Sequence, residues 1–292
     1  MTAGEGAPID ELLDVLTVRP AGSDRFLGGV GGRALPRLFG GQVLAQALLA
    51  AGRTVPGGRR PHSLHAYFVR PGDSAVPLEL DVRRLRDGRH FSTRRVTIRQ
   101  NGRDIAESMS SFHDGSQPEP AHQQYTAPGV PAPDEVPPLE HWLEPHHDRL
   151  PDWWATPHPF DLRFTEEPTG LTKGRVREPR QHFWLRTAGS VPGDGLLHAA
   201  LIAYASDLTL LDTALFPSGR SWYDDPVAGA SLDHTLWFHA PPRADDWLLC
   251  EQSCPVGGDG LALTECRMTD RAGRLVVSGA QEGLIRERPA RP

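Results

Sequence analysis

Two segments of the chain are apolar on every face of a helix, and they give the strongest pattern in the sequence. The first covers residues 39–51 and the second covers residues 196–211. A helix that is apolar all round has no solvent face, so both segments are predicted to form helices buried inside the fold. Asp207 is the only carboxylate in the second segment.

Strand-like stretches follow each predicted helix. In the first half they cover residues 64–70, 78–85, 91–100 and 105–112, and in the second half residues 232–239, 247–253, 261–268 and 275–285. The stretch at 91–98 is rich in β-branched and aromatic residues, which is typical of strands. Asp87-Gly88 and Asn101-Gly102 are typical of tight hairpin turns. Each half is therefore predicted to contain one buried helix and an antiparallel meander.

The two halves repeat each other in register. Short motifs recur in both, namely Tyr67-Phe68-x-x-Pro71 with Trp237-Phe238-x-x-Pro241 and Gly102-Arg103 with Gly273-Arg274. The offsets are 241 − 71 = 170 and 273 − 102 = 171, which indicates an internal duplication. Because a helix that is apolar all round has to be wrapped by a curved sheet, we predict an α+β double hotdog. In this fold two tandem units each hold a central helix inside a curved antiparallel sheet.

Proline and histidine concentrate between residues 114 and 159. Such a stretch cannot sustain a regular helix or a central strand. It is about forty residues long, which exceeds ordinary loops and separates two units. We therefore predict an N-terminal unit at 1–115, a connector at 116–158 and a C-terminal unit at 159–292. Trp142, Trp153 and Trp154 indicate that the connector packs onto a surface.

The charge balance argues against one class of function. The 292 residues include 31 Lys+Arg and 37 Asp+Glu, a net charge of −6 with a pI of about 6.1. A protein that binds nucleic acid without sequence preference needs a basic surface, so no nucleic-acid partner is expected. Three cysteines, Cys250, Cys254 and Cys266, have neither disulfide-framework nor zinc-site spacing. We expect no metal and no cofactor.

The two ends of the chain predict no targeting signal. Residues 1–14 include acids and lack an apolar signal segment, and the last residues are not a peroxisomal tripeptide. Polar residues interrupt every apolar run well before the ~18 residues of a membrane helix. We expect a cytoplasmic protein without a membrane span.

A series of motifs resembles one known family. In the first half these motifs are Leu38-Phe39-Gly40-Gly41-Gln42-Val43, the stretch His62-Ser63-Leu64-His65-Ala66-Tyr67-Phe68-Val69-Arg70-Pro71-Gly72-Asp73, and Leu85-Arg86-Asp87-Gly88. In the second half they are Tyr204-Ala205-Ser206-Asp207-Leu208, Ser231-Leu232-Asp233-His234 and Ala280-Gln281-Glu282-Gly283-Leu284-Ile285-Arg286. They run in order from about residue 37 to 286 and together resemble the acyl-CoA thioesterase II family.

The resemblance implies a double-hotdog fold and a role in fatty acid and lipid metabolism. The implied reaction is cofactor-free hydrolysis of acyl-CoA to free fatty acid and coenzyme A. The family's catalytic Asp, Ser or Thr, and Gln fall on Asp207, Ser231 and Gln281. One stretch, residues 258–265, departs from the small-residue and Arg-Gly pattern that the family usually carries there.

The residues themselves allow the same chemistry. A carboxylate buried in an apolar helix is costly without hydrogen-bond partners, so Asp207 is either functional or a partly exposed helix-end cap. In a sheet that wraps the helix, Ser231 and Gln281 can both face Asp207. Asp207 would then act as general base for a water that Ser231 and Gln281 hold. The alternative is that Ser231 is a covalent nucleophile.

Five further residues are candidates for binding the substrate. Gly40 and Gly41 begin the first buried helix, where backbone N–H groups can stabilise an oxyanion, and Gln42 follows them. Tight packing would explain the glycines equally well. His65 is a candidate contact with structural hydrogen bonding as its alternative. Arg94 is a candidate for CoA phosphates, with an outward-facing strand charge as its alternative.

Two competing functions stay open at this point. A hotdog enoyl-CoA hydratase or dehydratase typically needs an Asp–His pair in one pocket. Asp233 and His234 are adjacent on a predicted strand and point to opposite faces, which counts against this function. A non-catalytic acyl-CoA-binding protein would not need Asp207, Ser231 and Gln281 together. Exposed sheet edges also predict a homodimer or tetramer.

Overall fold

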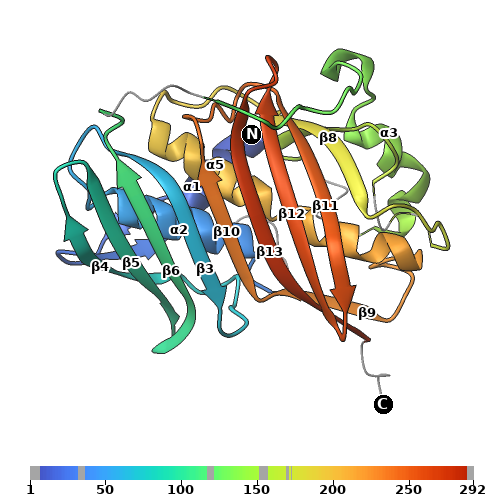
Figure 1. The fold of residues 1–292 in the computed structure, drawn as a ribbon. Helices are drawn as coiled ribbons and strands as arrows, with labels where there is room; N and C mark the ends of the chain where they lie inside the picture. Colours follow the sequence, from blue (N-terminus) through green and yellow to red (C-terminus); the bar gives the residue numbers. More distant parts are fainter. Residues whose placement is uncertain are drawn as a thin grey trace, which may run out of the picture.

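The computed structural model describes residues 7–31, 37–116, 122–150, 157–168, 171 and 173–287. Within these ranges thirteen strands form one antiparallel sheet, with the order β1-β2-β4-β5-β6-β3-β10-β13-β12-β11-β8-β7 and β9 paired to β13. The helices α2 (Gly40–Gly52) and α5 (Gly195–Ser206) lie side by side across one face of this sheet (Figure 1). The predicted double hotdog is confirmed.

The N-terminal half follows the predicted order. Its elements are α1 (Pro8–Leu16), β1 (Val18–Pro20), β2 (Arg25–Gly28), α2, β3 (Arg60–Phe68), β4 (Glu79–Asp87), β5 (Phe91–Gln100) and β6 (Arg103–His113). The helix and its four-stranded meander were predicted, whereas α1, β1 and β2 were not. The buried residues Ile9, Leu12, Val15 and Leu16 give α1 one apolar face, a helical spacing that the sequence does contain.

The C-terminal half repeats this plan with additions. Its elements are β7 (Phe160–Phe164), β8 (Arg180–Thr187), α5, η3 (Leu210–Ser218), β9 (Val227–Ser231), β10 (Asp233–Phe238), β11 (Leu248–Gly258), β12 (Leu261–Asp270) and β13 (Leu275–Glu287). The predicted helix at 196–211 ends early, at Ser206. Thr209 leaves the helical region at φ −141° and bonds to Gln252 through its hydroxyl at 2.9 Å. Asp207 therefore lies at the C-cap of α5.

The two halves join through their equivalent strands, β3 and β10, at the middle of the sheet. The antiparallel register pairs Ser63 with Trp237, His65 with Thr235, and Tyr67 with Asp233. With the 170-residue offset, position 65 pairs with its own equivalent, 65 + 170 = 235, and the other two pairs exchange places. This self-complementary register makes the internal duplication two-fold symmetric, as in an isologous dimer.

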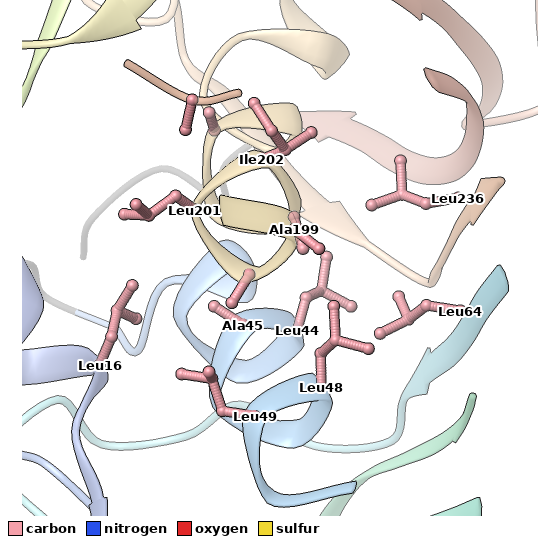
Figure 2. Packing of buried hydrophobic residues seen from close by; sticks show 14 of the residues in the cluster. Leu16, Leu44, Ala45, Leu48, Leu49, Leu64, Ala199, Leu201, Ile202 and Leu236 are labelled. Carbon is pink, nitrogen blue, oxygen red and sulfur yellow. The ribbon is translucent and has the colours of Figure 1, made fainter. Parts of the chain in front are cut away.

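The core lies between the two helices and the sheet. Every residue of α2 from Gly41 to Ala51 is buried, and Figure 2 shows Leu44 and Ala45 beneath Ala199 of α5, with Leu64 and Leu236 of the sheet beside them. This packing explains why α2 is apolar all round. The run Gly195–Ser218 reaches the length and apolarity of a membrane helix, but 67% of its most apolar window is buried inside the protein.

The connector differs from its prediction in one respect. It contains a five-residue helix, α3 (Leu139–Leu143), flanked by the 3₁₀ helices η1 (Pro133–Glu135) and η2 (Glu144–Arg149). Pro138 is the N-cap of α3, and the 3₁₀ helices carry proline in their first turn, where a missing N–H costs little. Trp142 packs against the core as expected. Trp153 and Trp154 lie outside the described residues, as do residues 117–120 of the Pro-rich stretch.

Candidate active site

Asp207 is held inside the protein at the end of α5. The residue is the C-cap of α5, as the helix-end alternative expected, but its side chain is only 6% exposed and faces the interior. The Gly41 backbone N–H, at the start of α2, donates to its carboxylate. The C-terminal end of one central helix thus meets the N-terminal end of the other, where unpaired backbone N–H groups favour a negative charge.

Ser231 and Gln281 reach the same carboxylate from the sheet. Ser231 ends β9, which pairs with β13 beside Gln281. Gln281 Nε2 donates to Ser231 Oγ at 2.6 Å, and Ser231 Oγ donates to Asp207 Oδ1 at 3.5 Å. The structure therefore brings together the three side chains that the sequence singled out, and their catalytic role stays a prediction.

The environment of Asp207 changes its acidity. Burial raises the pKa of Asp207 to about 7, although hydrogen bonds from Gly41, Ser231 and Gln281 act in the opposite direction. Desolvation penalises the charged form and therefore outweighs these donors. A carboxyl group that titrates near neutral pH can both accept and return a proton, which is the property of a general base.

His234 completes the cluster, and its approach to Asp207 was not predicted from the sequence. Its ring is fully buried, with Nδ1 2.8 Å from Gln281 Oε1, Nε2 2.9 Å from Ser206 Oγ, and Nδ1 3.7 Å from Asp207 Oδ1. Burial lowers the pKa of His234 to about 4. A signal was present in the sequence, because His234 alternates in phase with the apolar Leu236 and Phe238 and therefore points inward.

The two glycines that begin α2 allow this close approach. A Cβ on Gly40 would lie 2.6 Å from Asp207 Oδ2, and one on Gly41 would lie 2.4 Å from the Tyr204 carbonyl oxygen. Both glycines therefore pack α2 against α5. The Gly41 N–H donates to Asp207 in this structure. Its expected role in stabilising an oxyanion stays a prediction.

A methyl group at Gly40 is expected to displace the carboxylate. We predict that Gly40→Ala lowers kcat by about tenfold, because small misplacements of a catalytic group are costly. Steady-state kinetics on a folded variant would measure this. The matched control is Gly57→Ala, where a Cβ meets nothing within 4 Å and φ is not positive. Equal kcat values for the two variants would contradict the prediction.

A cavity of about 260 Å³ lies near the ends of α2 and α5 that meet at the cluster. Its lining includes Leu12, Phe39, Gln42, Phe160, Tyr204 and Leu208. Phe39 precedes Gly40 and Leu208 follows Asp207, so both helix ends at the cluster contribute neighbours of its residues to the lining. Its lining side chains are mostly apolar, which suits a hydrocarbon chain. Of the predicted binding residues, Gln42 thus lies at the site, where its Nε2 is 3.4 Å from the Gly29 carbonyl.

His65 does not join the cluster. On β3 its neighbours Leu64 and Ala66 are buried, whereas His65 is exposed on the opposite face of the sheet. There it contacts the hydroxyl of Thr235 and the ring of Trp237, whose centroid is 5.4 Å away. The structural alternative describes His65 better than substrate binding.

Arg94 also lies away from the cluster, and both of its interpretations fail. Its side chain is fully buried, so it is neither an outward charge nor open to a CoA phosphate. It donates from Nε to Thr54 Oγ1 at 2.7 Å, from Nη2 to the Thr54 carbonyl at 2.9 Å, and from Nη2 to Asp87 Oδ1 at 2.8 Å. Arg94 therefore joins β5 to the chain that follows α2. A buried charge is tolerated because it is paired.

Groups of His, Cys, Asp or Glu side chains able to hold a metal ion do not occur in the part of the chain that the structure describes. Cys250, Cys254 and Cys266 are free and buried, in keeping with their irregular spacing in the sequence.

Comparison with known proteins gives matches to both halves. A family model described as the acyl-CoA thioesterase N-terminal domain matches residues 32–113. A second model, described as the acyl-CoA thioesterase C-terminal domain, matches residues 133–285. The C-terminal match begins within the connector predicted at 116–158.

Individual proteins match over most of their length. The chain is 40% identical over 266 residues to acyl-coenzyme A thioesterase 8 of Mus musculus, which covers 87% of this chain and 81% of that protein. It is 36% identical to acyl-CoA thioesterase 2 of Haemophilus influenzae, with 86% and 88% covered. The solved structure of acyl-CoA thioesterase II from Mycobacterium marinum superposes with a TM-score of 0.77 at 35% identity, with 96% of this chain and 99% of that chain covered.

Proposed function

Because the chain belongs to the acyl-CoA thioesterase II family, it hydrolyses acyl-CoA to a fatty acid and coenzyme A, and we propose that Asp207 activates the attacking water. One observation carries the proposal. The hydrogen-bonded cluster of Asp207, Ser231 and Gln281 lies between the ends of the two central helices, and the same helix ends contribute Phe39 and Leu208 to the lining of a cavity. A thioester placed there would have its acyl chain in the cavity and its carbonyl at the carboxylate.

The reaction needs one base and a few donors. Asp207 takes a proton from water as the water oxygen bonds to the thioester carbon, and the C–S bond then breaks. The proton held by Asp207 passes to the departing CoA thiolate, so the carboxylate is regenerated. The Ser231 hydroxyl, which accepts from Gln281, orients the water. The N-terminal backbone of α2 supplies a positive potential for the developing oxyanion.

A covalent route through Ser231 is the alternative within the same site. A serine nucleophile requires a base at its hydroxyl. Both nitrogens of His234 are bonded elsewhere, to Gln281 and Ser206, so the covalent route would use the Asp207 carboxylate, to which the Ser231 hydroxyl donates at 3.5 Å. The same carboxylate would serve either route, and we propose direct attack by water. Mass spectrometry of enzyme quenched during turnover tests this, and an acyl adduct on Ser231 would establish the covalent route.

The approach of His234 to Asp207 favours a second candidate function, the hydratase. The separation of 3.7 Å provides the Asp–His pair that such enzymes typically need. However, the imidazole is fully buried, both nitrogens are engaged, and burial lowers the pKa of His234 to about 4. An imidazole in this state is a poor proton donor or acceptor for a substrate. Incubation with an enoyl-CoA should therefore give hydrolysis without hydration.

The cavity is expected to set the preference for acyl chain length. We predict that Leu12→Trp lowers kcat/KM for hexadecanoyl-CoA about tenfold relative to butanoyl-CoA. Excluding about two methylenes costs roughly 1.6 kcal/mol. The ratio between the two substrates cancels losses of folded enzyme. Leu85→Trp, at an exposed site on β4, is the control, and a ratio unchanged from wild type in Leu12→Trp would place the acyl chain elsewhere.

The thiol-release assay over acyl-CoA substrates of increasing length tests the activity as a whole. The cytoplasmic location and the assembly into a homodimer or tetramer stay predictions.

A further inference from the structure

The proposed mechanism leaves one buried group at the site without a role. The ring of His234 lies behind the Gln281 amide, between it and the Ser206 hydroxyl at the end of α5. A neutral imidazole carries one donor and one acceptor, and a side-chain amide carries a donor group and an acceptor group. The proton on His234 therefore determines which end of the Gln281 amide faces Ser231.

Two arrangements satisfy these contacts. In the first, His234 Nδ1–H donates to Gln281 Oε1, the Ser206 hydroxyl donates to Nε2, and the Gln281 amide nitrogen donates to Ser231. In the second, His234 carries its proton on Nε2, donates to Ser206, and accepts from the Gln281 nitrogen. The amide oxygen of Gln281 then faces Ser231, 2.6 Å from its hydroxyl.

The Asp207 carboxylate decides between the two. In the second arrangement an amide oxygen would approach a buried anion, and the single Ser231 proton would be shared between two acceptors. In the first, the amide N–H donates to Ser231, and the Ser231 proton remains available to Asp207 at 3.5 Å. Donors directed at a buried carboxylate stabilise it, and an opposed acceptor destabilises it.

We propose that His234 is a positioning residue, whose Nδ1–H holds the Gln281 amide with its nitrogen toward Ser231 and Asp207. This inference rests on the proposed catalytic role of Gln281. Ser206 belongs to the same device, because its hydroxyl proton has to be directed at His234 Nε2 and not at the Ala203 carbonyl, which is also 2.9 Å away.

Two substitutions separate positioning from packing. In His234→Asn the side-chain nitrogen takes roughly the place of Nδ1 and keeps the donor to Gln281. In His234→Gln the nitrogen takes roughly the place of Nε2, and the donor is lost although the volume is closer to that of histidine. If His234 only fills space, His234→Gln should have a higher kcat than His234→Asn. The positioning role predicts the reverse, with kcat of His234→Gln about tenfold below that of His234→Asn and KM changed little.

The wild-type protein provides a second, independent test. The ring ¹⁵N chemical shifts of His234, assigned by their perturbation in Gln281→Ala, are expected to show a neutral Nδ1–H tautomer. An Nε2–H tautomer would overturn the inference even where the variants fail to fold. A kcat of His234→Gln equal to or above that of His234→Asn would also overturn it.

Gln281→Ala distinguishes failure of the proposed catalytic cluster from failure of the proposed role of His234. If it hydrolyses acyl-CoA at the wild-type rate, the proposed catalytic cluster is wrong. If it is inactive and the tautomer is Nε2–H, only the role of His234 is wrong.

Discussion

Replacing Asp207 with asparagine is expected to lower kcat for acyl-CoA hydrolysis by 10²-fold or more. Asparagine keeps the size and can still accept a hydrogen bond from Gly41, but it cannot take a proton from water. General-base catalysis typically contributes 10²- to 10⁴-fold, and the rest of the site is left in place. Thiol release under saturating acyl-CoA measures the effect. A rate near that of wild type would remove Asp207 from the mechanism.

Asp212 offers a matched control for this substitution. It is a second carboxyl group whose pKa is raised by burial to about 7. Its partner is Trp222, whose Nε1 donates at 2.7 Å, and an asparagine there can still accept that bond. Asp212→Asn is therefore expected to keep kcat within a few-fold of wild type. A comparable loss in both variants would indicate that removing any buried carboxylate damages the fold.

Asp207→Asn is also expected to change how the stability of the protein depends on pH. Because the pKa of Asp207 is raised from 3.8 to about 7, the folded protein binds more protons than the unfolded chain between these pH values. The contribution of the group to stability is therefore present at low pH and lost as pH rises through about 7. Relative to wild type, Asp207→Asn should gain stability between pH 4 and pH 8, by about 1.4 kcal/mol per pH unit at most. Denaturant unfolding at several pH values measures this difference.

Strong local patterns made the fold predictable. The two central helices are apolar on every face, and the strands of the two meanders alternate between apolar and polar residues. These two patterns identify each element as a buried helix or a strand. The turn at Asn101-Gly102 has φ of 49° and 70°, as its sequence requires. The strands β7 and β8 were not predicted, since they follow a Pro-rich connector whose composition hides them. Their pairing is long-range, with β8 bound to β11 some seventy residues later.

The candidate site was predictable in part, for two different reasons. Asp207 is conspicuous because it is a lone carboxylate in an apolar helix. Ser231 and Gln281 are ordinary polar strand residues, and only the resemblance identified them. Arg94 was misassigned because a strand arginine is usually at the surface, while here Asp87 and Thr54 pair it inside. The contact of His234 with Asp207 depends on where α5 ends, which no local pattern specifies.

The pH dependence of wild-type enzyme is expected to show a large effect from the same carboxyl group. Only ionised Asp207 can accept a proton, and burial raises its pKa to about 7. kcat/KM should therefore fall about tenfold per pH unit below pH 7, to about 1% of its plateau at pH 5. Above pH 8 the rate should be constant. The fall in kcat/KM below pH 7 reports the pKa of Asp207 in the free enzyme, because acyl-CoA hydrolysis is followed at substrate concentrations well below KM.

The identity of the titrating group can be tested with variants that shift the midpoint of this fall in kcat/KM to another pH. The hydrogen bond from Ser231 lowers the pKa of Asp207, so Ser231→Ala should shift the midpoint to higher pH while reducing the plateau. Asp212→Asn should leave the midpoint where it is, although Asp212 has the same raised pKa. Titration of His234 cannot produce the fall in kcat/KM near pH 7, because burial lowers the pKa of His234 to about 4. A midpoint that moves with Asp212→Asn and not with Ser231→Ala would identify Asp212, and not Asp207, as the titrating base.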